Sequence, residues 1–62
     1  MTETQQVHAL VLEFFNGDFE KTRLWMRTRN PGLGNLTPKD LIFLRPGKVL
    51  RFVVQAMKEN GP

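Results

Sequence analysis

The stretch that decides the fold is "NPGLGNLTPKDLI", residues 30–42, because it combines a helix start with two closely spaced glycines. Thr37 is placed to cap a helix, since its hydroxyl can accept a backbone N–H, and Pro38 suits the first helical position. Asp40 is expected to complete the cap as a short capping-box acid. The stretch therefore predicts a short helix from Pro38 to Leu44.

The two glycines, Gly32 and Gly34, raise the alternative of a loop that binds phosphate. A dinucleotide loop needs GxGxxG after a strand, and Thr37 stands at the third glycine position. The P-loop pattern GxxxxGK[ST] is absent, and a helix rather than a strand is predicted before the glycines. We therefore expect the glycines to let the backbone turn sharply between packed helices.

Two helices are predicted before this stretch. Apolar residues spaced as one helix face predict a helix over residues 3–15, with its buried stripe formed by Val7, Leu10, Val11 and Phe14. Asn16 and Gly17 end it, because both tolerate the left-handed conformation of a helix exit. Asp18 then caps a helix over residues 19–28, in which Trp25 adjoins an apolar face made by Phe19, Thr22 and Met26.

A fourth helix is predicted from Pro46 to about Glu59. Its polar residues form one narrow stripe, namely Lys48, Arg51, Gln55 and Lys58, and the rest is almost wholly apolar. Either this helix is central, or its second apolar face meets another chain. A β-strand over residues 48–54 is the alternative, since the segment is rich in β-branched residues. The expected fold is all-α, a bundle of about four short helices completed by dimerisation.

The composition limits the chemistry that this chain can perform. Its 62 residues form one domain at most, residues 1–62, and contain no cysteine, no serine and a single histidine. We expect no catalytic site, no metal site and no cofactor, with His8 at the rim of the core or of an interface. No apolar run spans a bilayer and no leader peptide is recognised, so a cytoplasmic protein is expected.

Residues 21–51 carry eight basic side chains against one acid, Asp40, a net charge of +7. Such a patch can attract nucleic acid or an acidic protein, or can simply be the solvated faces of helices. In the nucleic-acid alternative, Trp25 stacks on a base while basic side chains contact phosphates. The candidate contacts are Arg23, Arg27, Arg29, Arg45, Lys48 and Arg51.

Residues 10–61 resemble a bacterial family, the C-terminal toxin-binding domain of Xre/MbcA/ParS-like antitoxins. The resemblance rests on the order and spacing of Gly17-Asp18, Trp25-Met26, Asn30-Pro31, Leu33-Gly34, Thr37-Pro38, Asp40-Leu41 and Gly47, with Glu59 and Gly61 near the end. Members of the family usually carry a helix-turn-helix region before this domain. The present sequence resembles the domain alone.

The resemblance implies a protein that binds and neutralises a RES-domain toxin, an enzyme that consumes NAD. In such pairs the end of the antitoxin approaches the cleft of the toxin, which by position implies Met57, Lys58, Glu59, Asn60 and Gly61. The surplus apolar face of the fourth helix adds Leu50 and Val54 as expected contacts to a partner or to a second copy. The alternative function is a small basic nucleic-acid-binding or transcription-regulatory protein, of which a phage-borne form is one version.

Overall fold

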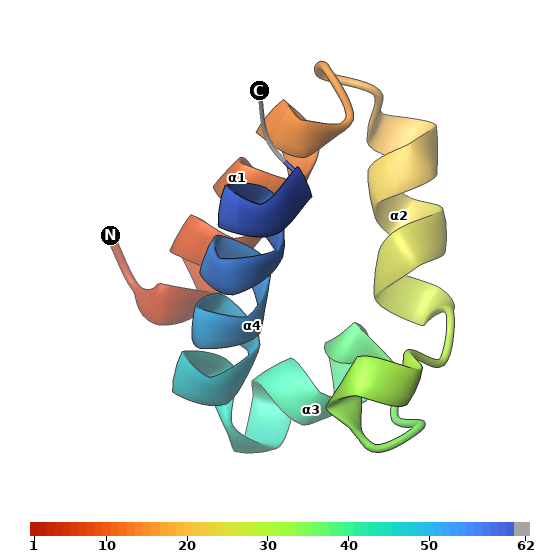
Figure 1. Cartoon of the computed structure of the whole chain (residues 1–62), viewed down its shortest axis with the longest axis vertical. Coiled ribbons are helices and arrows are strands. Elements are labelled where there is room, and N and C mark those ends of the chain that lie inside the picture. Colours follow the sequence, from red (N-terminus) through yellow and green to blue (C-terminus); the bar gives the residue numbers. More distant parts are fainter. Residues whose placement is uncertain (61–62) are drawn as a thin grey trace.

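A computed structural model describes residues 1–60 of the chain, except for the side chain of Asn60. This part of the chain is all-α and contains no strand, only an isolated bridge between Asn30 and Leu36 (Figure 1). The elements in chain order are α1 (Glu3–Phe14), α2 (Phe19–Arg27), the 3-10 turn η1 (Pro31–Leu33), α3 (Pro38–Leu44) and α4 (Pro46–Asn60). The prediction of four short helices is confirmed, and residues 48–54 are helix rather than strand.

The helices begin where side chains can accept their first free N–H groups. The Asp18 carboxylate accepts from the Lys21 N–H, and the Thr37 hydroxyl accepts from the Asp40 N–H, each at 3.1 Å. Each such cap contributes about 1 kcal/mol to stability. The start of α1 is capped by Thr2, whose hydroxyl accepts from the Gln5 N–H while the Gln5 side chain accepts from the Thr2 N–H.

The capping box expected at α3 is only half formed. Thr37 accepts from Asp40, but the described structure has no return bond from the Thr37 N–H to the Asp40 carboxylate. An aspartate is one methylene shorter than the glutamine that completes the box at Thr2. Because its side chain is too short to reach the Thr37 N–H, Asp40 is an acid in the first turn of α3 and not a capping-box partner.

Asn16 and Gly17 end α1 as predicted, and the chain reverses there. Asn16 and Gly17 adopt positive φ angles of 56° and 83°. The Asn16 N–H donates to the Glu13 carbonyl and the Gly17 N–H donates to the Leu12 carbonyl, the two bonds of a Schellman motif. Because these bonds satisfy the last carbonyls of α1, α2 can begin immediately at Phe19.

The loop between α2 and α3 is organised by Asn30. Its side-chain oxygen accepts from the Gly32 N–H at 2.9 Å, and its carbonyl accepts from Leu33 and Asn35 at 2.9 and 3.0 Å. The Gly34 N–H donates to the Pro31 carbonyl, so all four consecutive N–H groups of residues 32–35 have acceptors inside the loop. The loop therefore has no row of free N–H groups with which to hold a phosphate.

The two glycines of the loop are required for different structural reasons. Gly34 has a φ of 70°, the left-handed conformation expected at a sharp turn. At Gly32 the constraint is space, because a Cβ there would lie 2.5 Å from Cε1 of Phe52 on α4. This close approach brings Leu33, which is 2% exposed, into the core, a role that the sequence pattern did not indicate.

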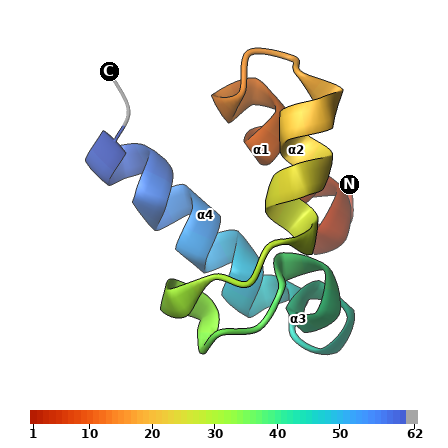
Figure 2. The ribbon, with the colours of Figure 1, turned by 90° about the vertical axis from the view of Figure 1, so that its right-hand side faces the viewer.

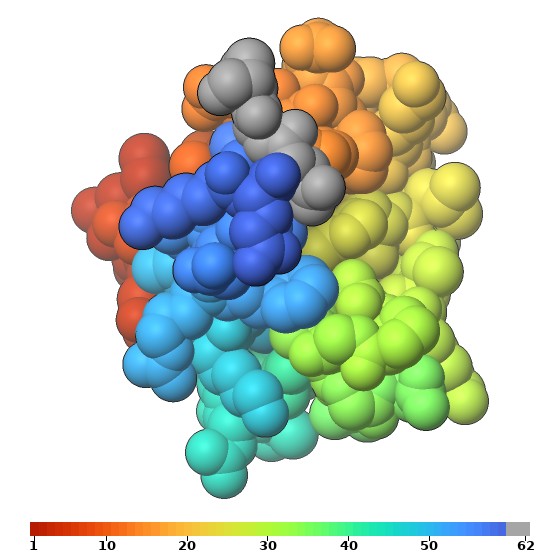
Figure 3. Space-filling view, in the orientation of Figure 1, coloured from red at the N-terminus to blue at the C-terminus, as the bar shows by residue number. Residues whose placement is uncertain are grey.

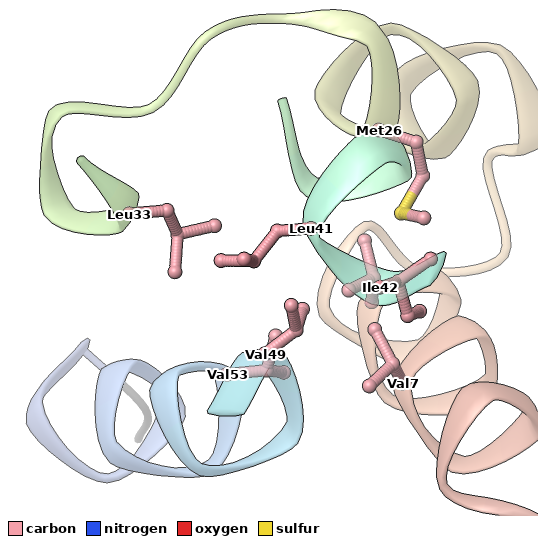
Figure 4. Packing of buried hydrophobic residues seen from close by; sticks show 8 residues of the cluster. Val7, Met26, Leu33, Leu41, Ile42, Val49 and Val53 are labelled. Atoms are coloured by element: carbon pink, nitrogen blue, oxygen red, sulfur yellow. The ribbon is translucent and has the colours of Figure 1, made fainter. Parts of the chain in front are cut away.

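The core lies where α1 and α4 pack together and are closed at one end by α3 and η1 (Figures 1 and 4). The buried apolar side chains are Val7, Val11, Met26, Leu33, Leu41, Ile42, Val49 and Val53. α1 and α4 run in the same general direction, since Glu3 lies beside Gly47 near their starts and Phe14 lines a cavity with Met57 near their ends. The segment from α2 to α3 forms the crossover that parallel helices require.

Two aromatic residues expected in the core are largely outside it. Phe14 is 47% exposed and Phe19 is 70% exposed. Phe14 packs edge-on against Phe15, with ring centroids 5.2 Å apart, and Phe15 packs against the core instead. Phe19 is the first residue of α2, beside the turn that leaves α1, so no further element covers it.

Helix α4 is central. This is one of the two explanations given above for its wide apolar surface, the other being contact with another chain. It packs against α1, α3 and η1, and Val49 and Val53 are buried. Leu50, Phe52 and Met57 are partly buried against the same core. Only Val54, at 37% exposure, remains among the exposed large apolar residues of this helix.

The contact between Gly32 and Phe52 generates a stability prediction. Gly32→Ala should lower the free energy of unfolding by about 1 kcal/mol, because overpacking outweighs the smaller gain from a less flexible unfolded chain. The measurement is urea unfolding followed by circular dichroism. In a Phe52→Leu background the added methyl group has room, so the loss should largely disappear. An equal loss in both backgrounds would show that the Phe52 ring is not the cause.

Candidate partner-binding site

A partly open cavity of about 220 Å³ lies between α1, α2 and α4 near the C-terminal end of α4. Its walls are mainly aromatic and apolar, and include Phe14, Phe15, Trp25, Phe52, Ala56 and Met57. In Figure 2, α4 runs diagonally away from α2 towards its C-terminal end. Trp25, Phe52 and Met57 are only partly buried. Apolar concavities of this kind accept anchor side chains from partner proteins.

The local structure explains how these aromatic residues meet. The Schellman turn after α1 leaves Phe14 and Phe15 at the end of that helix and folds α2 back alongside it. Trp25 comes from the last turn of α2, and it is half-buried. Phe52 and Ala56, one turn apart on α4, form the opposite wall.

The predicted partner-binding residues divide into two places on α4. Met57 lines the aromatic cavity, while Leu50 and Val54 line a separate shallow hollow of about 340 Å³ together with Met1, Ala9 and Leu10. The structure therefore does not unite the predicted set into one surface.

The last turns of α4 stand at the surface of the face seen in Figure 3. Lys58 and Glu59 are exposed there, and the Glu59 carboxylate accepts from the Gln55 side-chain amide at 3.1 Å. Asn60 is the final residue of the helix. The side chain of Asn60 and the whole of Gly61, both predicted to contact a partner, lie outside the described residues.

All six basic residues of the nucleic-acid alternative are exposed, namely Arg23, Arg27, Arg29, Arg45, Lys48 and Arg51. The structure does not join them to Trp25 as that alternative supposed. Trp25 lines the aromatic cavity, whereas Arg23 and Arg27 line a different groove on the other side of α2. A tryptophan enclosed among Phe14 and Phe52 is poorly placed to stack on a base that those arginines hold.

His8 is exposed on α1 and lines the groove that contains Arg23 and Arg27, so it is not part of the core. Its expected position at an interface stays a prediction. Within residues 1–60, no three His, Cys, Asp or Glu side chains are grouped so as to hold a metal ion. Over the same residues no helix has the length and apolar character needed to cross a membrane.

Sequence reasoning did not identify the cavity itself. The sequence pattern places Phe14 and Phe52 on apolar helix faces. The pattern cannot distinguish a residue that lines a cavity from one that is buried in the core. The available signal is the number of aromatic residues, five phenylalanines and one tryptophan in 62 residues, which is more than so small a core encloses. Which of them meet at one opening depends on how non-adjacent helices cross.

The arrangement is that of a small helical binding domain, with an aromatic cavity beside an exposed helix end. Residues 9–50, more than half of the chain, match the family model of the antitoxin Xre/MbcA/ParS C-terminal toxin-binding domain. The chain therefore belongs to this family of antitoxin domains. No match was found among curated proteins or among solved structures.

The match covers the parts of the chain that determine the fold. It includes the second half of α1, all of α2, η1 and α3, and the start of α4 up to Leu50. Phe52, Met57 and the end of α4 lie beyond the matched residues. Family membership thus supports a toxin partner in general, and the contribution of the end of α4 has to be argued from its own geometry.

The partial burial of Trp25 generates a second prediction. Trp25→Ala should lower the free energy of unfolding by about 2 kcal/mol, less than the ~3–5 kcal/mol of a fully buried aromatic residue, because the ring faces a cavity open on one side. Urea unfolding measures the loss, and Trp25→Phe, which keeps most of the contact area, is the matched control. Acrylamide should quench Trp25 fluorescence to an intermediate degree. Quenching as strong as that of free tryptophan would contradict the placement of the ring.

Proposed function

We propose that this protein is a non-catalytic cytoplasmic module that binds and inhibits a toxin protein, which by family resemblance is a RES-domain enzyme that consumes NAD. Its membership of a toxin-binding family carries the proposal. The aromatic cavity supplies an apolar contact area, and the exposed end of α4 supplies polar groups beside it. This combination of an apolar centre and a polar rim is typical of protein interfaces.

The inhibition is proposed to depend on the last turns of α4. Met57 and the rings of Trp25 and Phe52 enclose an apolar anchor side chain of the toxin, which excludes water from the contact. Lys58 and Glu59 then lie at the edge of that contact, directed towards the substrate cleft of the toxin. A carboxylate there would complement a cleft that binds the phosphates of NAD through basic side chains.

The inhibition experiment uses the full chain and a purified RES-domain toxin from the same source, with NAD consumption as the measurement. Met57→Glu and deletion of residues 58–62 should each raise the concentration needed for half-maximal inhibition at least tenfold, a loss of about 1.4 kcal/mol. Arg45→Glu, a charge change at the opposite end of α4, is the control and should leave inhibition unchanged. Unaltered inhibition by both tail variants would contradict the proposed role of this helix end.

We propose further that two copies associate through the hollow between α1 and α4. Leu50 and Val54 line the hollow from α4. Leu10 lines it from α1, and Met1 from the residues just before α1. A second copy would cover these apolar side chains, which a chain of this size cannot cover alone. The aromatic cavity is a separate opening, so dimerisation leaves it accessible to a toxin.

Sedimentation velocity tests the dimer. The unmodified protein should sediment as a dimer and Val54→Glu as a monomer, because a carboxylate at the centre of an apolar contact is desolvated without a partner. Phe43→Glu is the matched control, since Phe43 is 87% exposed on α3 outside this hollow. A monomer before any substitution, or dissociation caused by Phe43→Glu instead, would exclude this interface.

A further inference from the structure

A second groove lies on the other side of α2 from the aromatic cavity, between α1, α2 and α3. It has a volume of about 400 Å³ and shares no lining residue with the cavity. Basic side chains surround it, Arg23 and Arg27 from α2 and Lys39 from α3, and no acidic side chain lines it. Its chemistry is therefore different from that of the aromatic cavity.

The basic side chains of this groove have no partners among the described residues. Arg23, Arg27 and Lys39 are exposed, and the described residues form no salt bridge with them. Arg23 and Arg27 lie one helical turn apart, an arrangement of like charges that destabilises a helix. Arg27, in the last turn of α2, interacts favourably with the negative end of the helix dipole. The repulsion between Arg23 and Arg27 remains, and an anionic ligand would relieve it.

The floor of the groove is apolar. Met26 and Ile42 are buried and contribute their sides to it, while Phe19 stands at its edge with 70% of its surface exposed. A neighbouring hollow shares His8, Phe19 and Thr22 with the groove and extends it along α1 towards Leu12. Together they form a concave strip with cations at the α3 end and apolar groups along its length.

We propose that this groove binds an acidic, amphipathic segment of a protein partner. Carboxylates of the segment pair with Arg23, Arg27 and Lys39, and an apolar side chain of the segment packs over Met26 and Ile42. Phe19 then covers that side chain from the edge of the groove. Charge complementarity selects the ligand, since three unpaired cations on an apolar floor match a segment that alternates Asp or Glu with Leu, Ile or Phe.

A nucleic acid matches the groove less well than such a segment. Its phosphates could pair with the three cations, but its polar sugars would then lie against Met26 and Ile42. Phe19 and the smaller ring of His8 are the side chains in the groove that could stack on a base, since Trp25 faces the other side of α2. The apolar floor therefore favours a protein ligand.

This inference does not rest on the proposed toxin site. The groove and the aromatic cavity lie on the two sides of α2, so a partner in one does not cover the lining residues of the other. The tail variants should lose toxin inhibition and keep ligand binding in the groove. Variants of the groove should lose that ligand binding and keep toxin inhibition. The two proposals can fail separately.

The test uses a fluorescein-labelled amphipathic peptide of about 12 residues, roughly three helical turns, composed of Glu and Leu. Fluorescence anisotropy measures its binding to the full chain, and amide shifts in NMR spectra locate it. A second peptide with Ser in place of Leu and a thymidine oligonucleotide are the comparison ligands. We expect the Glu/Leu peptide to bind best and to shift the amides of Thr22, Arg23, Arg27 and Lys39.

Matched charge-reversal variants separate the groove from the overall positive charge. Arg23→Glu, Arg27→Glu and Lys39→Glu together should weaken peptide binding at least tenfold, whereas Arg45→Glu, Lys48→Glu and Arg51→Glu together change the net charge equally and should weaken it much less. Circular dichroism checks that each variant is folded. If the groove variant is not, Arg23→Gln with Arg27→Gln replaces it and should weaken binding in the same direction.

Three outcomes would overturn the proposal. Equal losses in the two charge-reversal variants would mean attraction to net charge and not to the groove. If the Ser peptide bound as tightly as the Glu/Leu peptide or more tightly, the apolar floor would have no part in recognition. If the oligonucleotide did so, nucleic acid would be the favoured ligand. No binding of the Glu/Leu peptide up to about 1 mM, weaker than about −4 kcal/mol, would exclude a useful docking site.

Discussion

The packing of α4 along α1 is the interaction on which the rest of the structure depends. Val7 and Val49 are fully buried, and Val11 and Val53 nearly so. Because the two helices run in the same general direction, a short hairpin cannot connect them, and the chain needs a crossover. The segment α2–η1–α3 is that crossover, and its course around the central pair determines which surfaces stay open.

Asn30 and the residues that follow it make this crossover possible in few residues. Four consecutive N–H groups find acceptors inside the loop, so the chain can turn without exposing unsatisfied polar groups to the core. Leu33 enters the core from this loop, and Gly32 permits the close approach to Phe52. The loop is thus part of the packed structure as well as a connection between helices.

The same course leaves α2 with two different sides. Trp25 faces the aromatic cavity shared with α1 and α4, and Arg23 and Arg27 face the basic groove shared with α1 and α3. Within residues 1–60 no further element covers either side. The chain belongs to a toxin-binding family, and we propose a toxin for the first of these surfaces and an acidic segment of a protein partner for the second.

The sequence by itself determined the helices, their order and most of their ends. Asp18, Thr37 and the Asn16-Gly17 exit act through hydrogen bonds within a few residues, so their effects can be recognised locally. The family resemblance was likewise carried by the order of short motifs from Gly17 to Gly47, with Glu59 and Gly61 near the end. Only the tertiary structure decided that Phe15 packs in the core more closely than Phe14, that Leu33 is buried, and that α4 is covered mainly by its own chain. These outcomes depend on how helices distant in sequence cross and face one another, which periodicity along a single helix does not specify.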